Sequence, residues 1–211
     1  MPLGDSITLG VNGGYRNTLR TSLTTAGCGV NYVGSQFDQY AVIGDKNHEG
    51  HPGFTISDIS ASVSSWLAGY QPNYVLLMIG TNDIAWWSVK TGAEVAADQA
   101  ALIDQMQAAR PGAWIVVASI PPITSALIAP NNWDRAQLGR DYNAAMKVRI
   151  DARIAAGQKI RFADVYSVLT LADLYDGVHP TEAAHAKIAN VWTQALQTIL
   201  SCTNQAPVCA P

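Results

Sequence analysis

Charged residues are scarce in this sequence, and no hydrophobic run is long. Only 14% of the 211 residues are charged, and a formal net charge of −3 gives no electrostatic reason to expect nucleic acid or an anionic membrane as a partner. The longest apolar runs, at residues 74–79 and 114–120, fall far short of the roughly 20 residues that span a bilayer. We therefore expect no membrane-spanning segment and interpret these runs as buried strands.

Cysteine is rare as well, since Cys28, Cys202 and Cys209 are the three in the chain. This number fits neither a disulfide-dense scaffold nor a zinc site. Cys202 and Cys209 lie close together in a polar, proline-containing tail, and we predict a small loop-closing disulfide between them. Cys28 follows a helical segment and is predicted to be a buried, unpaired thiol. The tail disulfide favours a secreted, extracellular protein, whereas the lack of a visible signal peptide decides little.

Short apolar runs alternate with longer segments of helical periodicity along the chain. The pattern predicts helices at 15–25, 57–67, 93–109, 134–156 and 181–200, and strands at 1–3, 30–33, 74–79, 114–120 and 160–162. Strands that are apolar throughout and alternate with helices are typical of a parallel sheet covered on both faces. The sequence therefore predicts one α/β domain at 1–200, a three-layer α/β/α sandwich around a five-stranded parallel sheet, with a tail at 201–211.

The first loop at the carboxyl edge of this sheet contains a serine. Ligands of open parallel sheets bind at this edge, so its loops are where we expect chemistry. Residues 4–10 begin with Gly-Asp-Ser directly after the first strand. A serine at a strand-to-helix turn lies near backbone N–H groups that can stabilise an oxyanion. The alternative is that Ser6 or Asp5 only caps a helix.

Two further loops carry polar side chains suited to catalysis. Residues 80–83 read Gly-Thr-Asn-Asp, and Asn82 is a good oxyanion donor because its amide has a dipole without a titrating charge. A plain turn is the alternative for this tetrapeptide. In the last loop, Asp176 precedes His179 across a glycine turn and can hold its tautomer, as a histidine base requires. An Asp-x-x-His pair at a helix entrance is less often purely structural than a lone histidine.

Taken together, residues 4–6, 80–83 and 176–179 resemble, in the expected order, the first, third and fifth sequence blocks of the SGNH (GDSL-type) hydrolase superfamily. The segment 48–53, His-Glu-Gly-His-Pro-Gly, resembles the second block, which supplies a glycine N–H to the oxyanion hole. We assign this role to Gly53 rather than to Gly50. The resemblance covers most of the chain. It implies a flavodoxin-like three-layer fold and a serine esterase that works through an acyl-enzyme, without a metal or another cofactor.

The resemblance also implies a role for each residue. Ser6 would be the nucleophile, His179 the base that takes its proton, and Asp176 the acid that orients the histidine ring. The oxyanion hole would consist of the backbone N–H groups of Ser6 and Gly53 and the side-chain amide of Asn82.

Longer motifs resemble one subfamily, carbohydrate esterase family 3, whose members remove acetyl groups from xylan. These motifs are residues 1–8, 14–16 and 48–51. They imply an acetylated polysaccharide or oligosaccharide as the substrate of an enzyme that we expect to be monomeric. Trp86, just beyond the predicted oxyanion asparagine, is predicted to form a wall facing the sugar, and packing in the core is its alternative.

Several alternatives stay open. A general lipolytic esterase or thioesterase on the same fold would prefer longer acyl chains, and a non-catalytic carbohydrate-binding protein would retain the fold alone. An α/β-hydrolase is set aside, since its G-x-S-x-G elbow would need glycine where Thr8 stands. His48 and His51 have an unpersuasive spacing for a metal site and are predicted to shape the loop that presents Gly53. His185 is interpreted as a packing or surface residue.

Overall fold

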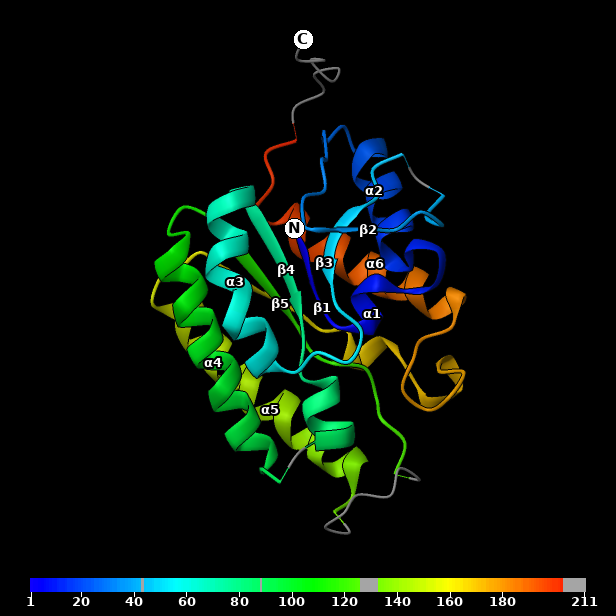
Figure 1. Ribbon diagram of the computed structural model, residues 1–211, viewed down its shortest axis with the longest axis vertical. Coiled ribbons are helices and arrows are strands. Elements are labelled where there is room, and N and C mark those ends of the chain that lie inside the picture. Colours follow the sequence, from blue (N-terminus) through cyan, green and yellow to red (C-terminus); the bar gives the residue numbers. More distant parts are fainter. Residues whose placement is uncertain (43, 88, 126–132, 203–211) are drawn as a thin grey trace.

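Six strands form one mixed sheet at the centre of the molecule (Figure 1). The structure is a computed structural model that describes residues 1–42, 44–87, 89–125 and 133–202. The strands are β1 Pro2–Gly4, β2 Gln36–Phe37, β3 Asn47–Gly50, β4 Tyr74–Met78, β5 Trp114–Ala118 and β6 Ile160–Ala163, in the order β2-β3-β1-β4-β5-β6. Five of them are parallel, as predicted, but β2 pairs antiparallel with β3. The predicted five-stranded parallel sheet is therefore corrected to a mixed one of six, because a very short edge strand leaves no sequence pattern.

The strand predicted at 30–33 is not formed, and β3 takes the place beside β1. The backbone N–H of Tyr32 donates to the side chain of Asp45, and the Tyr32 hydroxyl donates to the carbonyl of Arg16. Side chains rather than a strand ladder therefore fix this segment. The sequence of β3, Asn-His-Glu-Gly, has no apolar pattern, although its histidine and glutamate are buried. Hydrophobic periodicity could not reveal such a strand.

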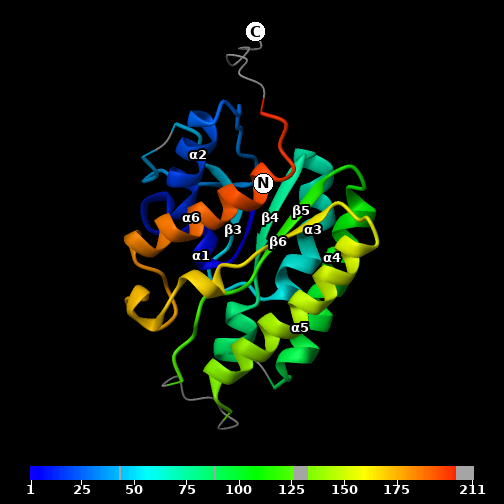
Figure 2. The ribbon, with the colours of Figure 1, turned by 180° about the vertical axis from the view of Figure 1, so that it is seen from behind.

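Helices cover both faces of the sheet, as Figures 1 and 2 show from opposite sides. The helices are α1 Ser6–Leu9, α2 Tyr15–Thr25, α3 Ile56–Tyr70, α4 Gly92–Ala109, α5 Arg135–Ala155 and α6 Glu182–Gln197, and the single turns are η1 Val11–Gly13, η2 Asp83–Trp87, η3 Tyr166–Val168 and η4 Leu171–Asp173. The predicted long helices are confirmed with small shifts at their ends. α3 begins before Ser57 because Thr55 and Asp58 form a reciprocal capping box. In the described part of the chain, no helix is long and apolar enough to cross a membrane.

The central strands contribute to two hydrophobic cores because their side chains alternate between the faces of the sheet. In β4, Val75 and Leu77 belong to the core beneath α3, α4 and α5, whereas Leu76 and Met78 belong to the core beneath α2 and α6. Burial on both faces explains why this strand reads as a continuous apolar run. The three predicted layers are thus confirmed, and the carboxyl ends of the parallel strands meet at one edge.

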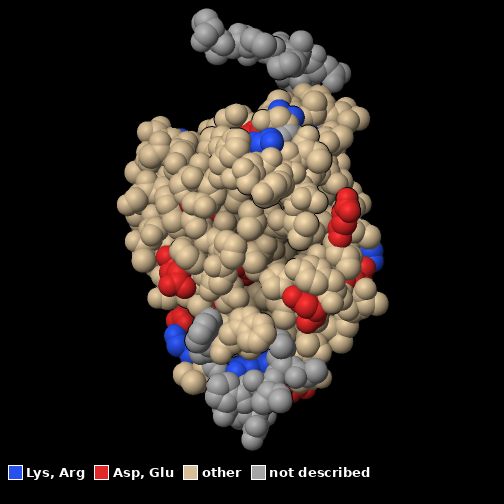
Figure 3. Space-filling view, turned by 45° about the vertical axis from the view of Figure 1, so that its right-hand side comes forward, with Lys and Arg blue, Asp and Glu red and all other residues tan. Residues whose placement is uncertain are grey.

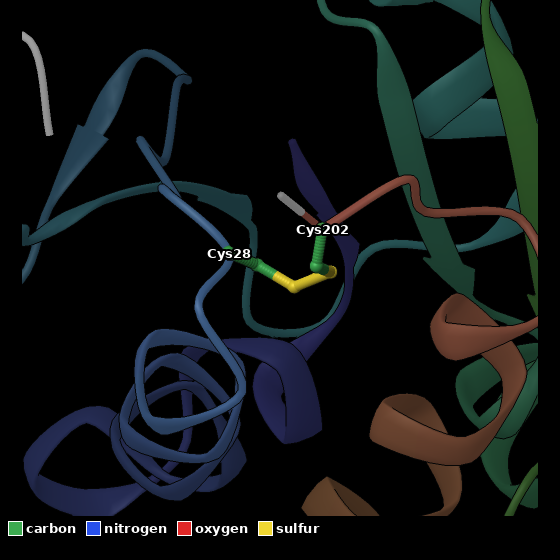
Figure 4. Close-up of a disulfide and its surroundings, with 2 residues drawn as sticks. All are labelled: Cys28 and Cys202. Carbon is green, nitrogen blue, oxygen red and sulfur yellow. A yellow bond between two sulfur atoms is a disulfide. The ribbon is translucent and has the colours of Figure 1, made fainter. Parts of the chain in front are cut away.

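The cysteine pairing differs from the predicted one. Cys28 and Cys202 form a disulfide, with 4.7 Å between their Cα atoms (Figure 4). Cys28 is buried as predicted, but it is not a free thiol, and Cys202 is not joined to Cys209, which lies outside the described residues. The pairing is set by tertiary packing. Because α2 and α6 pack side by side in one core, the chain leaving α2 meets the chain leaving α6.

Removing this disulfide should lower the stability of the protein. The two cysteines are 174 residues apart, for which the chain-entropy model gives a stabilisation of about 5 kcal/mol, at the upper end of the measured range. The Cys28→Ser/Cys202→Ser variant should therefore melt at a Tm lower by about 10–20 °C in thermal denaturation without reductant. Cys209→Ser is the matched control and should melt like the wild type. A destabilised control beside an unaffected double variant would show that the Cys28–Cys202 pairing is wrong.

Candidate active site

Ser6, His179 and Asp176 form a continuous hydrogen-bonded chain at the carboxyl edge of the sheet. Ser6 is the first residue of α1, directly behind β1, and the other two lie in the loop before α6. Ser6 Oγ is 2.9 Å from His179 Nε2, and His179 Nδ1 is 2.7 Å from Asp176 Oδ2. The serine and the histidine are 173 positions apart, so only the fold brings them together. In this arrangement the serine can give its proton to a histidine whose ring the carboxylate holds.

The turn that carries Ser6 is fixed at both ends. Asp5 is its N-cap, and Asp5 Oδ1 accepts the N–H of Ile7 at 2.9 Å. At the other end, the buried Arg16 donates to the carbonyls of the last two residues of α1, at 3.2 and 2.9 Å, and forms an ion pair with Asp38 at 3.0 Å. A cation at the carboxyl end of a helix interacts favourably with its dipole. Arg16, for which sequence reasoning found no role, therefore supports the position of the serine.

Local hydrogen bonds hold the loop that carries His179. Asp176 Oδ1 accepts the N–H groups of Val178 at 2.9 Å and of His179 at 2.7 Å. Gly177 has a φ of 84°, a backbone conformation that glycine adopts without strain, and its carbonyl accepts the N–H of Thr124 at 3.0 Å. Burial acts to raise the pKa of Asp176, but the hydrogen bonds from His179 and Val178 outweigh it and hold this pKa below its usual value. Asp176 is therefore ionised at neutral pH, as a ring-orienting acid must be.

Asn82 and the segment that begins at Gly53 lie on loops that are tied together. Asn82 Nδ2 donates to the carbonyl of Phe54 at 2.9 Å. The carboxylate of Asp83 accepts the N–H of Ile56, the first residue of α3, at 3.1 Å. The loop after β4 is thereby fixed against the loop between β3 and α3, which keeps the two predicted oxyanion donors in a constant relation. Asp83 was part of a motif in the sequence, but its role as a link is visible only in the structure.

The structure also bears on the choice between Gly50 and Gly53. Gly50 is the last residue of β3, where it is buried, and its N–H donates to Nδ1 of His48 at 3.0 Å. This donor is already used. Gly53 lies in the exposed turn that follows, with a φ of 82° that favours glycine. These positions favour Gly53 over Gly50. The roles of Gly53, Ser6 and Asn82 in the oxyanion hole stay predictions.

His51 shapes the loop before Gly53. Its Nε2 is 2.7 Å from Glu49 Oε1, and its ring stacks on Phe54 and on Trp66, with centroid distances of 4.5 and 4.8 Å. Among the described residues, no group of three or more His, Cys, Asp or Glu side chains is arranged to hold a metal ion. These contacts agree with the structural role that the sequence predicted for this histidine.

Two exposed aromatic side chains lie in the loops of the site. Trp86, in η2, is 47% exposed, so the alternative that it packs in the core is wrong, while its contact with substrate stays a prediction. Tyr175 is 62% exposed, and its ring stacks on His179 at a centroid distance of 5.8 Å. Sequence reasoning missed Tyr175, although it directly precedes the Asp-x-x-His motif. A cavity of about 170 Å³ opens here, lined by Ser6, Tyr175 and His179 among others.

Burial next to the nucleophile changes the titration of Asp5. The residue is fully buried, and this desolvation raises its pKa to about 6, only partly offset by the hydrogen bond from Ile7. An aspartate in an unfolded chain has a pKa near 3.9. Between these two values the folded state binds more protons than the unfolded state. The free energy of unfolding must therefore decrease as the pH rises through this range.

We expect Asp5 to lower the free energy of unfolding by about 2 kcal/mol between pH 4 and pH 6. The Asp5→Asn variant should lack this decrease, because its side chain still has an oxygen that can accept the N–H of Ile7 but cannot ionise. Urea unfolding at several pH values from 4 to 7 measures the effect. Asp151→Asn makes the same change at an exposed position and should follow the wild type. Parallel curves for Asp5→Asn and the wild type would contradict the raised pKa.

Comparison with known proteins gives matches over nearly the whole chain. The model of the GDSL-like Lipase/Acylhydrolase family matches residues 3–187. A family 3 carbohydrate esterase of Clostridium thermocellum is 31% identical and superposes with a TM-score of 0.76, covering 94% of this chain and 94% of its own. A carbohydrate esterase family 3 structure from Talaromyces cellulolyticus is 27% identical, with a TM-score of 0.81, over 94% of this chain and 96% of its own.

A curated relative is much longer than this chain. The multidomain esterase of Ruminococcus flavefaciens is 29% identical over 97% of this chain, but the chain spans only 29% of that protein. The similarity therefore concerns one part of the relative.

Proposed function

Because the chain belongs to the GDSL-like lipase/acylhydrolase family and is an ester hydrolase of that family, we propose that it removes acetyl groups from acetylated xylan or xylo-oligosaccharides. The observation that carries the proposal is the hydrogen-bonded chain from Ser6 through His179 to Asp176. It lies in a fold shared, over 94% of the chain, with family 3 carbohydrate esterases.

The proposed reaction begins with attack of Ser6 Oγ on the ester carbonyl carbon, while His179 Nε2 accepts the serine proton. The backbone N–H groups of Ser6 and Gly53 and the Asn82 amide stabilise the resulting oxyanion. The bond to the alcohol oxygen then breaks, and His179 gives its proton to that oxygen, which leaves an acetyl-serine. Water, deprotonated by His179, attacks this ester, and acetate leaves as Ser6 regains its proton. Asp176 stabilises the imidazolium in both half-reactions.

Several features support a sugar ester as the substrate. On the face drawn in Figure 3, charged side chains are scattered between wide uncharged areas, which suits an uncharged polysaccharide. Trp86 and Tyr175 offer exposed rings in the loops of the site, and such amphipathic rings can pack on the apolar face of a sugar.

We further propose that the enzyme is secreted and acts as a monomer, without a nucleic-acid or membrane partner. The Cys28–Cys202 disulfide supports secretion, since such bonds persist in oxidising compartments. The residues proposed for catalysis all come from a single chain, which supports activity as a monomer. Size-exclusion chromatography of the active protein tests this state.

A general lipolytic esterase or thioesterase is the second candidate. Val11 is 64% exposed near Ser6, and this apolar surface would suit a lipid-like substrate better than a sugar. A non-catalytic carbohydrate-binding protein is disfavoured, because binding alone does not require the hydrogen-bonded chain from Ser6 to Asp176.

Hydrolysis of p-nitrophenyl acetate, butyrate and octanoate, followed by acetate release from acetylated xylan, tests the proposal. We expect rapid turnover of the acetate ester, little turnover of octanoate, and release of acetate from the polysaccharide. Preference for octanoate without release from xylan would replace the proposal by the lipolytic alternative.

A further inference from the structure

At the edge of the active site, the ring of His185 packs near Tyr15 but has no hydrogen-bond partner among the described residues. It lies in the first turns of α6, its side chain is almost fully buried at 4% exposure, and it lines the same cavity as Ser6 and His179. No described residue forms a hydrogen bond with its ring; Nδ1 is buried, whereas Nε2 is not, so Nε2 is the nitrogen left to face the cavity. A buried polar group without a hydrogen bond is unfavourable. The ring is therefore suited to a partner that arrives with the substrate.

The surroundings of the ring fix both its position and its charge. Gly10 and Gly14 make room for it, since a Cβ atom at either position would lie 3.3 or 3.1 Å from Cε1 of His185. Burial, with a smaller contribution from the nearby Arg16, lowers the pKa of His185 to about 4. The imidazole is therefore neutral at neutral pH, with one N–H donor and one acceptor nitrogen. Depending on the tautomer, Nε2 can accept a hydrogen bond from a hydroxyl group or donate one to it.

The position of the cavity indicates which half of the substrate it receives. The residues that line it include 9–11, Tyr175, His179 and Pro180, and neither Gly53 nor Asn82 is among them. In the proposed mechanism the alcohol oxygen must lie next to Nε2 of His179 to receive its proton. In the same mechanism the oxyanion faces the predicted donors Gly53 and Asn82, which do not line this cavity. The cavity therefore lies on the alcohol side of the scissile bond.

We propose that His185 binds a hydroxyl group of the sugar that carries the acetyl ester, and that it thereby determines specificity for the alcohol half of the substrate. The inference rests on the proposed function and extends it to a residue outside the Ser–His–Asp chain. The exposed ring of Tyr175, stacked on His179, forms the outer wall of the same cavity.

The test compares two acetate esters that differ in the alcohol, p-nitrophenyl acetate and partially acetylated xylo-oligosaccharides. In the His185→Phe variant, kcat/KM should fall about 10-fold or more for the sugar ester and less than about 3-fold for the nitrophenyl ester, which lacks a sugar hydroxyl. His185→Gln, which retains a donor and an acceptor, should recover part of the loss. Asn190→Ala, an exposed position of α6, is the control and should resemble the wild type with both esters.

The outcomes are distinguishable. Equal losses of kcat/KM for the two esters in both His185 variants would mean that the residue only supports the fold. An unchanged kcat/KM for the sugar ester would mean that His185 makes no contact with the sugar hydroxyl. Either result overturns the inference. A wild type that hydrolyses p-nitrophenyl acetate but no sugar acetate would refute the proposed function itself, and the inference with it. That result is seen before any variant is measured.

Discussion

The Ser6→Ala variant is expected to lose about 10⁶-fold in kcat for acetyl ester hydrolysis. Alanine removes the atom that attacks the substrate carbonyl carbon in the first half-reaction, so no acetyl-enzyme can form. The backbone N–H of residue 6 and the other oxyanion donors remain, which leaves a small residual rate above that of water. The fold should not change, because among the described residues the Ser6 hydroxyl bonds only to His179, and the cap of α1 is provided by Asp5.

Initial rates with p-nitrophenyl acetate measure this loss, and labelling with a fluorophosphonate shows by mass spectrometry which serine reacts. Ser65→Ala makes the same chemical change at an exposed position of α3 and should retain full activity and labelling. Turnover by Ser6→Ala at a rate near that of the wild type would sink the nucleophile assignment. Label on a serine other than Ser6 would do the same.

The Asp176→Asn variant is expected to lose about 10⁴-fold in kcat near neutral pH, the size of effect seen when a serine-hydrolase triad loses its acid. An asparagine can keep the oxygen that accepts the N–H groups of Val178 and His179, so the turn should persist. Its NH₂ group would then face Nδ1 of the ring in place of Oδ2. The ring would be driven to the tautomer that carries its proton on Nε2, where it can no longer accept the proton of Ser6.

This prediction is checked by steady-state kinetics beside thermal denaturation, since the argument requires a large loss of rate with little change in Tm. Asp151→Asn, at an exposed site on α5, is the control for loss of one negative charge. An Asp176→Asn enzyme that keeps a tenth or more of the wild-type rate would show that Asp176 does not orient the base.

The layered α/β architecture follows from the sequence because it rests on local information. The alternation of helical and continuously apolar segments is a property of neighbouring residues, and it locates α2, α4, α5, β4 and β5 within a few positions. The bond between Asp176 and His179 is equally local, since a glycine turn can close it within the same loop. The order of the motifs also sufficed to select Ser6 and Asn82 as candidates, because loops at the carboxyl edge of a parallel sheet converge.

Other features were decided only by the tertiary structure, because they depend on contacts between residues far apart in the chain. β3 is a polar segment that becomes a buried strand through its pairing with β1, and no periodicity marks it. The disulfide joins Cys28 to Cys202, because α2 and α6 pack side by side, and not to the cysteine nearest in sequence. The support of α1 by Arg16 and the place of His185 in the cavity beside Ser6 likewise arise from packing. The sequence by itself determined the candidate catalytic residues, and the tertiary structure decided which groups support them, because such support acts across the core rather than along the chain.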